Sequence, residues 1–396
     1  MTGYQDRDAV IVGAVRTPIG KGKPDGALHG VLPADLLAHS LREVVRRTGI
    51  DSARIDDVIV GAVTQAGDQA VNIGRNALLG AGFPESVPGT TIDRQCGSSQ
   101  QAISFAAQGV LAGAYDIVVA AGVESMSRVP MGAALLPGSN PFGEDMTRRY
   151  PEGLVPQGIS AELIAAQWGF TRAELDEFSA ASHEKAALAT KAGLFDDELA
   201  PIAGLATDEL IRPGTTVETL ATLRPAFYDE AMKSRFPQIN WDITAGNSSP
   251  LSDGSAAVVI TSGEVAKKLG LRPLARIHTT TVVGSDPLYM LTGVIPATEK
   301  VLQRAGLTLA AIDLFEVNEA FAPVVLAWAK ETGADLAKTN VNGGAIALGH
   351  PLGASGARLM TTLVNALQHS GKRYGLQTMC EGGGMANATI IERLEG

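Results

Sequence analysis

Residues 28–34 read LHGVLPA, and residues 291–297 read LTGVIPA. After each heptapeptide, apolar residues recur at helical spacing: Leu37, Leu41, Val44 and Val45 in the first stretch, and Val301, Leu302 and Ala305 in the second. Two further pairs follow in the same order, 48–61 (TGIDSARIDDVIVG) with 305–318 (AGLTLAAIDLFEVN), and 115–126 (YDIVVAAGVESM) with 374–385 (YGLQTMCEGGGM). One match between Gly- and Ala-rich segments arises easily by chance, but three in one order indicate a duplicated unit.

Each copy has the pattern strand, helix, strand, helix, strand. In the first copy, we expect strands at 9–15, 57–63 and 116–121, and helices at 34–47 and 97–112. Strands that alternate with helices predict a mixed or largely parallel sheet covered on both faces. Two such halves can pack their helices together, so the expected fold is an α/β body of five layers, α/β/α/β/α.

The segment between the halves has a different composition. Residues 129–250 are rich in Pro and Gly, with helical patches at 161–168 and 172–192 and few strand signals. Long irregular insertions in compact α/β bodies are usually functional. We therefore expect an N-terminal half (1–128 plus 251–273), an inserted loop-rich subdomain (129–250) and a C-terminal half (274–396).

Composition and charge exclude several classes of function. The formal net charge of −10 opposes a general electrostatic attraction to nucleic acid or to an anionic membrane. Two cysteines in 396 residues make no disulfide framework and are typical of a reducing cytoplasm. The first residues (MTGYQDRDAVIVGAVRTP) lack a basic region followed by an apolar core, and the longest apolar stretches are too short to span a bilayer. Neither a metal-ligand spacing nor a G-x-G-x-x-G after the first strand is present.

Cys96 is the first candidate for chemistry. It lies in TIDRQCGSSQQAISF, where a β-like stretch ends and a helix is expected from Gly97. Unpaired amides and the positive end of the dipole at a helix N-terminus favour the nucleophilic thiolate. A buried, inert cysteine is an equally good interpretation of this segment alone.

Three further candidates follow expected strands or stand among glycines. His350 lies in NGGAIALGHPLGASGARL, and although a lone histidine is more often structural, this glycine density favours close approach of a ligand. Cys380 precedes three glycines whose N–H groups can bind an oxyanion, and its counterpart in the first copy is Ala121. Asn318 ends a repeated strand and can orient a water, although a turn-forming asparagine is an equally common interpretation.

These segments together resemble the thiolase family over nearly the whole chain. The segments that carry the resemblance are RQCGSSQQA, VNEAFA, NGGAIALGHPLGASGAR, CEGGGMA and TAGNSSPLSDGSAA. It implies reversible CoA-dependent thiolysis of 3-oxoacyl-CoA to acetyl-CoA and a shortened acyl-CoA, or the reverse Claisen condensation, through an acyl-Cys96 intermediate. The implied roles are proton acceptor for His350 and acid/base for Cys380. Asn318 holds a water, and the N–H groups of Cys96 and Gly382 stabilise an oxyanion.

The resemblance also implies a CoA site and a cellular setting. Arg212 matches a position near the adenine, Ser249 one on the pantetheine arm, and Met290 one lining the acyl pocket. Further local positive charge comes from Arg224, Lys233 and Arg235. CoA and acyl-CoA are substrates, and neither a tightly bound cofactor nor a metal is expected. We also expect a cytoplasmic homo-oligomer, a dimer or tetramer, acting in lipid metabolism such as fatty acid β-oxidation.

Two departures from the family pattern bear on the substrate. The nucleophile segment is commonly C-x-S-G-L, whereas here Cys96 is followed by Gly-Ser-Ser-Gln, with Asp93 upstream. Short-chain biosynthetic members carry His-Met before a Gly in the insertion, where this chain has Pro156-Gln157-Gly158. The lost methionine admits longer or bulkier acyl chains, so fatty-acid, sterol side-chain and acetoacetyl substrates all stay open.

Two alternative functions were weighed against a thiolase. One is a carrier- or CoA-dependent ketosynthase-type condensing enzyme, but such enzymes generally lack a second cysteine, and Cys380 argues against them. The other is a silent acyl-CoA-binding protein, which has no need to keep Cys96, His350 and Cys380 together.

Overall fold

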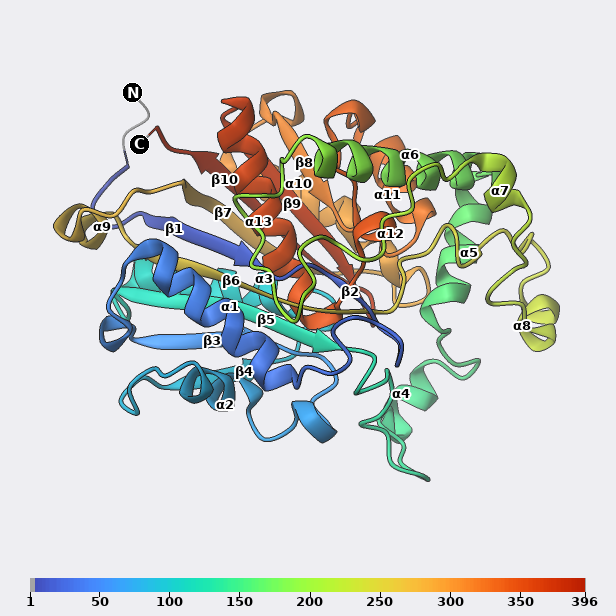
Figure 1. Cartoon of the computed structure of the whole chain (residues 1–396). Coiled ribbons are helices and arrows are strands. Elements are labelled where there is room, and N and C mark those ends of the chain that lie inside the picture. The colour runs from blue at the N-terminus through green and yellow to red at the C-terminus, as the bar shows by residue number, and fades with distance from the viewer. Residues whose placement is uncertain (1–3, 396) are drawn as a thin grey trace.

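The computed structural model describes residues 4–395, and its two halves have the same order of elements (Figure 1). The first half contains β1 (Ala9–Arg16), α1 (Pro33–Thr48), β3 (Asp57–Gly61), α3 (Ser98–Ala112), β5 (Ile117–Ser125) and β6 (Ser252–Ser262). The second contains β7 (Ala275–Gly284), α10 (Val294–Ala305), β8 (Leu314–Val317), α13 (Leu352–Ser370), β9 (Tyr374–Glu381) and β10 (Met385–Arg393). The predicted strands and helices of the first copy are therefore confirmed, and each half ends in one more strand, β6 or β10.

Each half contributes one mixed sheet, as predicted, and hydrogen bonds join the two into a single sheet of ten strands within residues 4–395. The strands follow the order β4-β3-β5-β6-β1-β7-β10-β9-β8, where β4 is Gly89–Ile92, and the short β2 (Gly20–Lys21) pairs with β6. Parallel pairs join β3 to β4 and β5, and β8 to β9, whereas the other pairs are antiparallel. A short contact between β1 and β7, through Val10 with Arg276 and Ile11 with Ala275, links the two halves.

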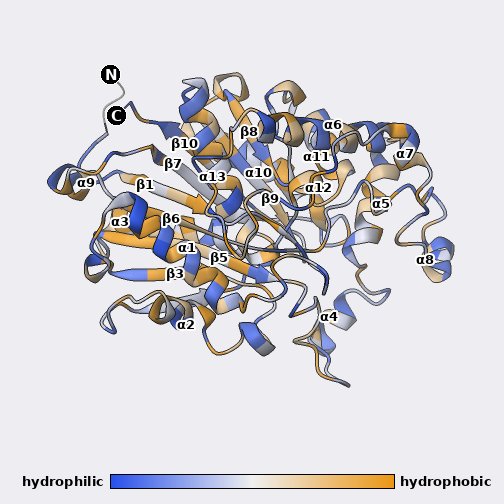
Figure 2. Cartoon of the chain, in the orientation of Figure 1, coloured by the Kyte–Doolittle hydropathy of each residue, from blue (hydrophilic) through white to orange (hydrophobic). Residues whose placement is uncertain are grey.

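Five layers result from the way the helices cover these sheets (Figures 1 and 2). One apolar cluster joins α1 and α2 (Ile73–Gly80) to the first sheet, and a second joins α10 and α11 (Ala322–Thr332) to the second sheet. The third cluster contains α3 and α13 with residues of both sheets. These two helices therefore form the central layer, and the predicted α/β/α/β/α arrangement is confirmed.

The segment 129–250 contains five helices and, in this fully described stretch, no named strand. They are α4 (Gly143–Arg149), α5 (Gln157–Trp168), α6 (Arg172–Lys191), α7 (Val217–Ala221) and α8 (Glu230–Arg235). The two helical patches predicted there are α5 and α6. Two short helices elsewhere are α9 (Gly263–Leu269) and α12 (Ala345–Leu348).

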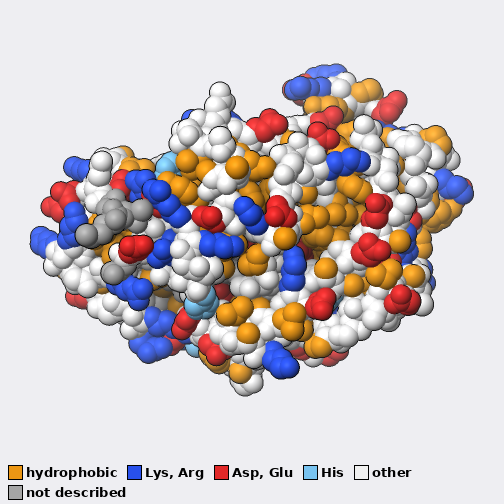
Figure 3. Space-filling model, turned by 90° about the horizontal axis from the view of Figure 1, so that it is seen from above, with side chains coloured by type: hydrophobic (Ala, Val, Ile, Leu, Met, Phe, Trp, Pro, Cys, Tyr) orange, Lys and Arg blue, Asp and Glu red, His pale blue; other side chains and the backbone are white. Residues whose placement is uncertain are grey.

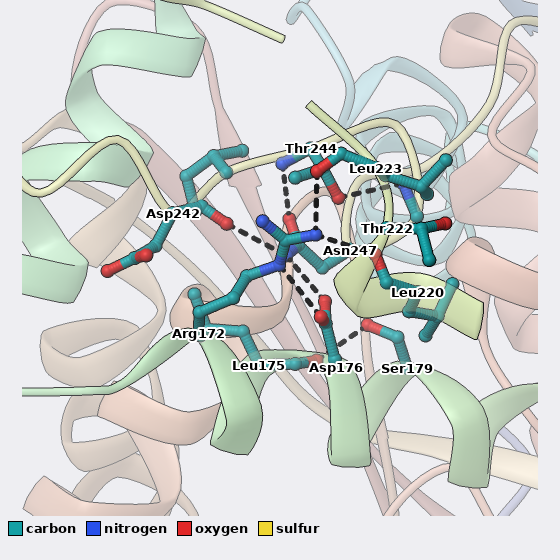
Figure 4. A network of polar contacts seen from close by, with 12 residues as sticks. Arg172, Leu175, Asp176, Ser179, Leu220, Thr222, Leu223, Asp242, Thr244 and Asn247 are labelled. Atoms are coloured by element: carbon teal, nitrogen blue, oxygen red, sulfur yellow. Dashed lines mark hydrogen bonds and ion pairs between the residues drawn. The ribbon is translucent and has the colours of Figure 1, made fainter. Parts of the chain in front are cut away.

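A polar network attaches the loops of this segment to α6 (Figure 4). The Arg172 guanidinium donates to Asp176 Oδ2 at 2.7 Å and to the carbonyl oxygens of Leu220 and Leu223 at 2.6 and 3.0 Å. Asn247 Nδ2 donates to Asp176 Oδ1 at 3.0 Å. Because Asp176 is buried, these charge-assisted bonds fix irregular backbone that has no strand to hold it.

On the face seen in Figure 3, acidic and basic side chains are interspersed. None of the helices between residues 4 and 395 is long and apolar enough to cross a membrane.

Candidate active site

Cys96 lies in a tight turn directly before α3. Gln95 has a positive φ of 48°, and Gly97 is the N-cap of the helix that begins at Ser98. The Ser98 hydroxyl closes the turn, since it accepts from the Arg94 N–H at 2.9 Å and donates to the Gln95 carbonyl at 2.6 Å. The predicted position of Cys96 at a helix start is confirmed, and only 3% of this residue is exposed.

The surroundings of the Cys96 sulfur favour the thiol in the resting protein. Burial raises the pKa of Cys96 to about 12, and the charge of Glu381 adds to this rise. Hydrogen bonds from the Gln157 side chain and from the N–H groups of Cys96 and Gly382 oppose it. The Cys96 N–H at the helix start therefore acts in the predicted direction, since it lowers the pKa of Cys96, but desolvation outweighs it in the resting protein.

Backbone geometry brings His350 into the site from the end of α12. Gly349 has φ of 103°, and a Cβ there would lie 2.5 Å from Ser252 Oγ, so only glycine fits. The His350 N–H donates to that same hydroxyl at 2.9 Å. The sharp turn therefore aims the imidazole from a fixed point at the junction between the two halves.

Two contacts of the His350 ring fit one tautomer, with the hydrogen on Nδ1. Its Nδ1 lies 2.5 Å from Ser355 Oγ, and that hydroxyl also lies 2.9 Å from the Pro351 carbonyl oxygen. When the hydroxyl donates to Pro351, Nδ1 carries the hydrogen and donates it to Ser355. On the other side, Asn318 Nδ2 lies 3.3 Å from Nε2, as expected if the amide donates to an unprotonated nitrogen.

His350 is neutral in the resting protein. Burial, with a smaller contribution from Arg358, lowers the pKa of its imidazole to about 3, so the ring carries no charge near pH 7. A neutral imidazole has one nitrogen lone pair, here on Nε2, at which it can accept a proton.

Asn318 and Cys380 lie at the ends of neighbouring strands. The Asn318 N–H, just past β8, donates to the Thr378 carbonyl on β9 at 3.1 Å. Asn318 Oδ1 is buried without a protein partner among residues 4–395, which leaves it free to bind a water. Burial raises the pKa of Cys380 well above its usual range, and the nearby Cys96 adds to that rise. Cys380 therefore holds a proton and can donate it.

A cavity of about 840 Å³ opens beside Cys96. Gln157 and Gly382, which both contact the Cys96 sulfur, also line this cavity. Much of the remaining lining comes from the insertion. The apolar residues of the lining are Phe142, Met146, Tyr150, Pro151, Leu154, Val155 and Pro156 from the insertion, and Met290 from the C-terminal half. The volume lies within the range of about 300–1,000 Å³ that small-molecule sites occupy.

The predicted CoA-binding residues fall in different places. Met290 is buried in the cavity lining. Ser249 is partly buried, and its N–H donates to the carbonyl of Ala320, two residues after Asn318, at 2.9 Å. Arg212 is exposed and not part of this lining; its N–H donates to His183 Nδ1 on α6 at 3.2 Å. Of the other cations, Arg235 reaches the rim, donating to the carbonyls of Glu152 and Gly153 at 2.7 and 2.8 Å.

Sequence reasoning missed four residues that the structure brings to the site: Gln157, Ser252, Ser355 and Glu381. A signal existed for Ser355, because the repeat aligns it with Cys96. For Glu381, the signal was an acidic residue at a strand end beside Cys380. Gln157 was noted only as a departure from the family pattern. Across the described residues 4–395, no three His, Cys, Asp or Glu side chains gather to hold a metal ion.

The chain is similar to known proteins over almost its whole length. The model of the thiolase N-terminal domain matches residues 9–264, and that of the thiolase C-terminal domain matches 271–393. The chain is 47% identical to the steroid 3-ketoacyl-CoA thiolase FadA6 of Mycobacterium tuberculosis, covering 98% of this chain and 94% of that protein. It is 44% identical to a 3-ketoacyl-CoA thiolase of Erwinia tasmaniensis, covering 97% and 99%. A crystal structure of the Bacillus anthracis acetyl-CoA acetyltransferase superposes with a TM-score of 0.87 at 40% identity, covering 98% and 99%.

Proposed function

The chain belongs to the thiolase family and is an acyltransferase that uses CoA thioesters, and on that premise we propose the role of each residue in cleaving 3-oxoacyl-CoA with CoA. The observation that carries the proposal is the position of the Cys96 sulfur. It receives hydrogen bonds from the N–H groups of Cys96 and Gly382, and Gln157 and Gly382 connect it to the cavity. This arrangement suits a nucleophile that carries an acyl group extending into the cavity.

The first half-reaction breaks the carbon–carbon bond. His350 Nε2 accepts the proton of Cys96, and the sulfur attacks the 3-keto carbon of the substrate. The N–H groups of Cys96 and Gly382 stabilise the oxyanion. The bond between C2 and C3 then breaks, and its electron pair forms the enolate of acetyl-CoA, which takes the proton of Cys380 at C2. The enolate oxygen receives hydrogen bonds from His350, now protonated, and from a water held by Asn318.

The second half-reaction releases the acyl group. The thiolate of Cys380 takes the proton of the incoming CoA thiol, whose sulfur attacks the acyl-Cys96 carbonyl. Collapse of this tetrahedral intermediate expels Cys96 as a thiolate and forms the shortened acyl-CoA. Cys96 recovers its proton from His350, so both thiols and the imidazole return to their resting states.

For the acyl group, we propose a chain longer or bulkier than acetoacetyl. The cavity supports this proposal, because its volume is much larger than the two carbons of an acetyl group fill. Most of its apolar lining comes from the insertion. A fatty-acid β-oxidation substrate and a sterol-derived chain both fit these walls. The name of FadA6 as a steroid 3-ketoacyl-CoA thiolase supports the second.

Several broader assignments are part of the same proposal. The chain divides into an N-terminal half (1–128 with 251–273), an insertion (129–250) and a C-terminal half (274–396). The two halves carry the catalytic residues, and the insertion forms the acyl pocket. Ser249 contacts the pantetheine arm, and Arg212 the adenine, with Arg235 as a further cation near the cavity. The enzyme acts as a homodimer or homotetramer in the cytoplasm.

Two measurements test the function. Thiolysis of 3-oxoacyl-CoAs of increasing length, followed by loss of enolate absorbance, should give a kcat/KM that rises beyond acetoacetyl-CoA. A preference for acetoacetyl-CoA would remove the acyl-chain proposal and leave the thiolase activity intact. Mass spectrometry should find acyl groups on the wild-type Cys96 peptide and none on the Cys96→Ala protein; acylation of that variant would refute Cys96 as nucleophile.

A further inference from the structure

Glu381 is a fully buried carboxyl group that the mechanism does not use. It is the last residue of β9 and directly follows Cys380. Both carboxyl oxygens are buried without a hydrogen-bond partner among residues 4–395. Polar groups in such places are usually satisfied, so this group calls for an explanation by function or by an ordered water.

The carboxyl group lies against the backbone of the nucleophile turn. A Cβ built on Gly97 would lie 1.9 Å from Glu381 Oε1, so any other residue at 97 would displace the carboxyl group. Asn387 on β10 lies close to the same point, and its Nδ2 donates to the Gly97 carbonyl at 3.2 Å. The absent side chain at position 97 is therefore what allows Glu381 to reach the residue after Cys96.

The charged and titratable groups that face Glu381 come from two elements. Asp93 and Arg94 lie on the turn before α3, where Arg94 favours the ionised carboxylate and Asp93 opposes it. No ion pair within 4.0 Å joins Arg94 to Glu381 in the described chain, since the Arg94 Nη1 instead contacts Met385 Sδ at 3.9 Å. The two thiols, Cys96 and Cys380, both feel the charge of Glu381. From β10, the neighbour is the uncharged amide of Asn387.

We propose that Glu381 is a positioning residue whose protonation state controls the nucleophile. As a neutral acid it packs against Gly97 and leaves Cys96 free to ionise, and as a carboxylate it opposes the thiolate. This inference rests on the proposed function only in taking Cys96 as the nucleophile.

The sign of the effect follows from burial. Desolvation raises the pKa of Glu381 to about 8, so the group is mainly neutral near pH 7 and ionises as the pH rises past 8. Its negative charge then raises the pKa of Cys96. A like charge in a dry site commonly shifts a neighbouring pKa by about one unit or more, which is about tenfold in thiolate fraction.

Alkylation of Cys96 in the resting, full-length protein tests this without any substrate. The rate with iodoacetamide is followed from pH 6.5 to 9.5 by mass spectrometry of the Cys96 peptide. In Glu381→Gln, the logarithm of the rate should rise with constant unit slope. In the wild type it should bend near pH 8 and fall about tenfold below the variant by the highest pH. Glu392→Gln, on the same hairpin but paired with Arg276 and Arg373, is the matched control and should bend like the wild type.

Three outcomes would overturn the inference. The first is a pH profile of Glu381→Gln that bends at the same pH as the wild type, and the second is a wild-type profile that stays straight. The third is an alkylation rate of Glu381→Gln at pH 7 that is more than about tenfold below the wild-type rate, with an unchanged melting temperature. The last would mean that the ionised carboxylate is needed at neutral pH. If Glu381→Gln does not fold, Glu381→Leu replaces the unpartnered carboxyl with an apolar group of similar size and should give the same straight profile. Because no thiolysis is involved, failure of this test is separate from failure of the proposed function.

Discussion

Ser355→Ala is the substitution that most directly tests how His350 is prepared for proton transfer. The Ser355 hydroxyl is fully buried, accepts the proton of His350 Nδ1 and anchors itself on the Pro351 carbonyl. Alanine leaves the Nδ1–H group buried without a partner, which costs about 1–3 kcal/mol. The ring can escape this cost by moving its hydrogen to Nε2, but that tautomer cannot accept the proton of Cys96.

The expected loss follows from that energy. If 1–3 kcal/mol separates the two tautomers, only about one molecule in 5 to 150 keeps Nε2 unprotonated, and acylation of Cys96 slows by the same factor. The assay is single-turnover acylation of Cys96 by a 3-oxoacyl-CoA, quenched and read by mass spectrometry. The melting temperature should fall by only about 1–4 °C, because a chain this long has a large unfolding entropy.

Ser99→Ala is the matched control. The Ser99 hydroxyl is also fully buried and accepts from the Ala357 N–H on α13 at 2.9 Å, so its loss removes one buried hydrogen bond without touching His350. It should lower the melting temperature similarly and leave acylation within about threefold of the wild type. Equal slowing in both variants, or wild-type acylation in Ser355→Ala, would refute the tautomer argument.

Three other predictions follow from the same site. Cys380→Ala should still form acyl-Cys96 from an acyl-CoA donor but lose at least about a hundredfold in 3-oxoacyl-CoA thiolysis, and full turnover would remove the acid/base role of Cys380. Gln157→Leu removes a hydrogen bond to the Cys96 sulfur and should slow its alkylation about tenfold at pH 8; an unchanged rate would mean that the bond is not made in solution. Burial holds the pKa of His350 near 3, below its unfolded value of about 6.5, so the folded state loses about 1.4 kcal/mol per pH unit as the pH falls through this window. Urea unfolding of His350→Asn should show a correspondingly weaker dependence on pH between 6 and 4.

The sequence predicted the fold because the fold is repetitive. Apolar periodicity identified α1 and β3, and the repeat then placed their counterparts α10 and β8. The last strand of each half was harder to predict. β6 follows the long insertion, and β10 follows β9 after only three glycines. Neither strand is therefore part of the alternation of strand and helix that predicted the other strands.

The site was only partly predictable, for a physical reason. Cys96, His350 and Cys380 are chemically distinctive and stand in distinctive local sequence, so each was a candidate alone, and the three together favoured a shared site. Gln157 and Ser355 have common side chains, and their roles depend on contacts across 61 and 5 residues of chain that no local pattern encodes. The net rise in the pKa of Cys96 was not predicted, because a helix start is visible in sequence, whereas burial of the sulfur is not.

Duplication followed by divergence explains how the two central helices share one reaction. Cys96 precedes α3 and Ser355 lies in the first turn of α13, at positions that the repeat aligns. Both copies therefore place a small nucleophilic atom where a helix of the central layer begins. In the proposed mechanism, the first copy uses a sulfur that takes the acyl group, and the second uses a hydroxyl that holds the base. Because α3 and α13 pack against one another, as the bond from the Ala357 N–H to Ser99 Oγ shows, the nucleophile and the support of its base are fixed in one rigid layer.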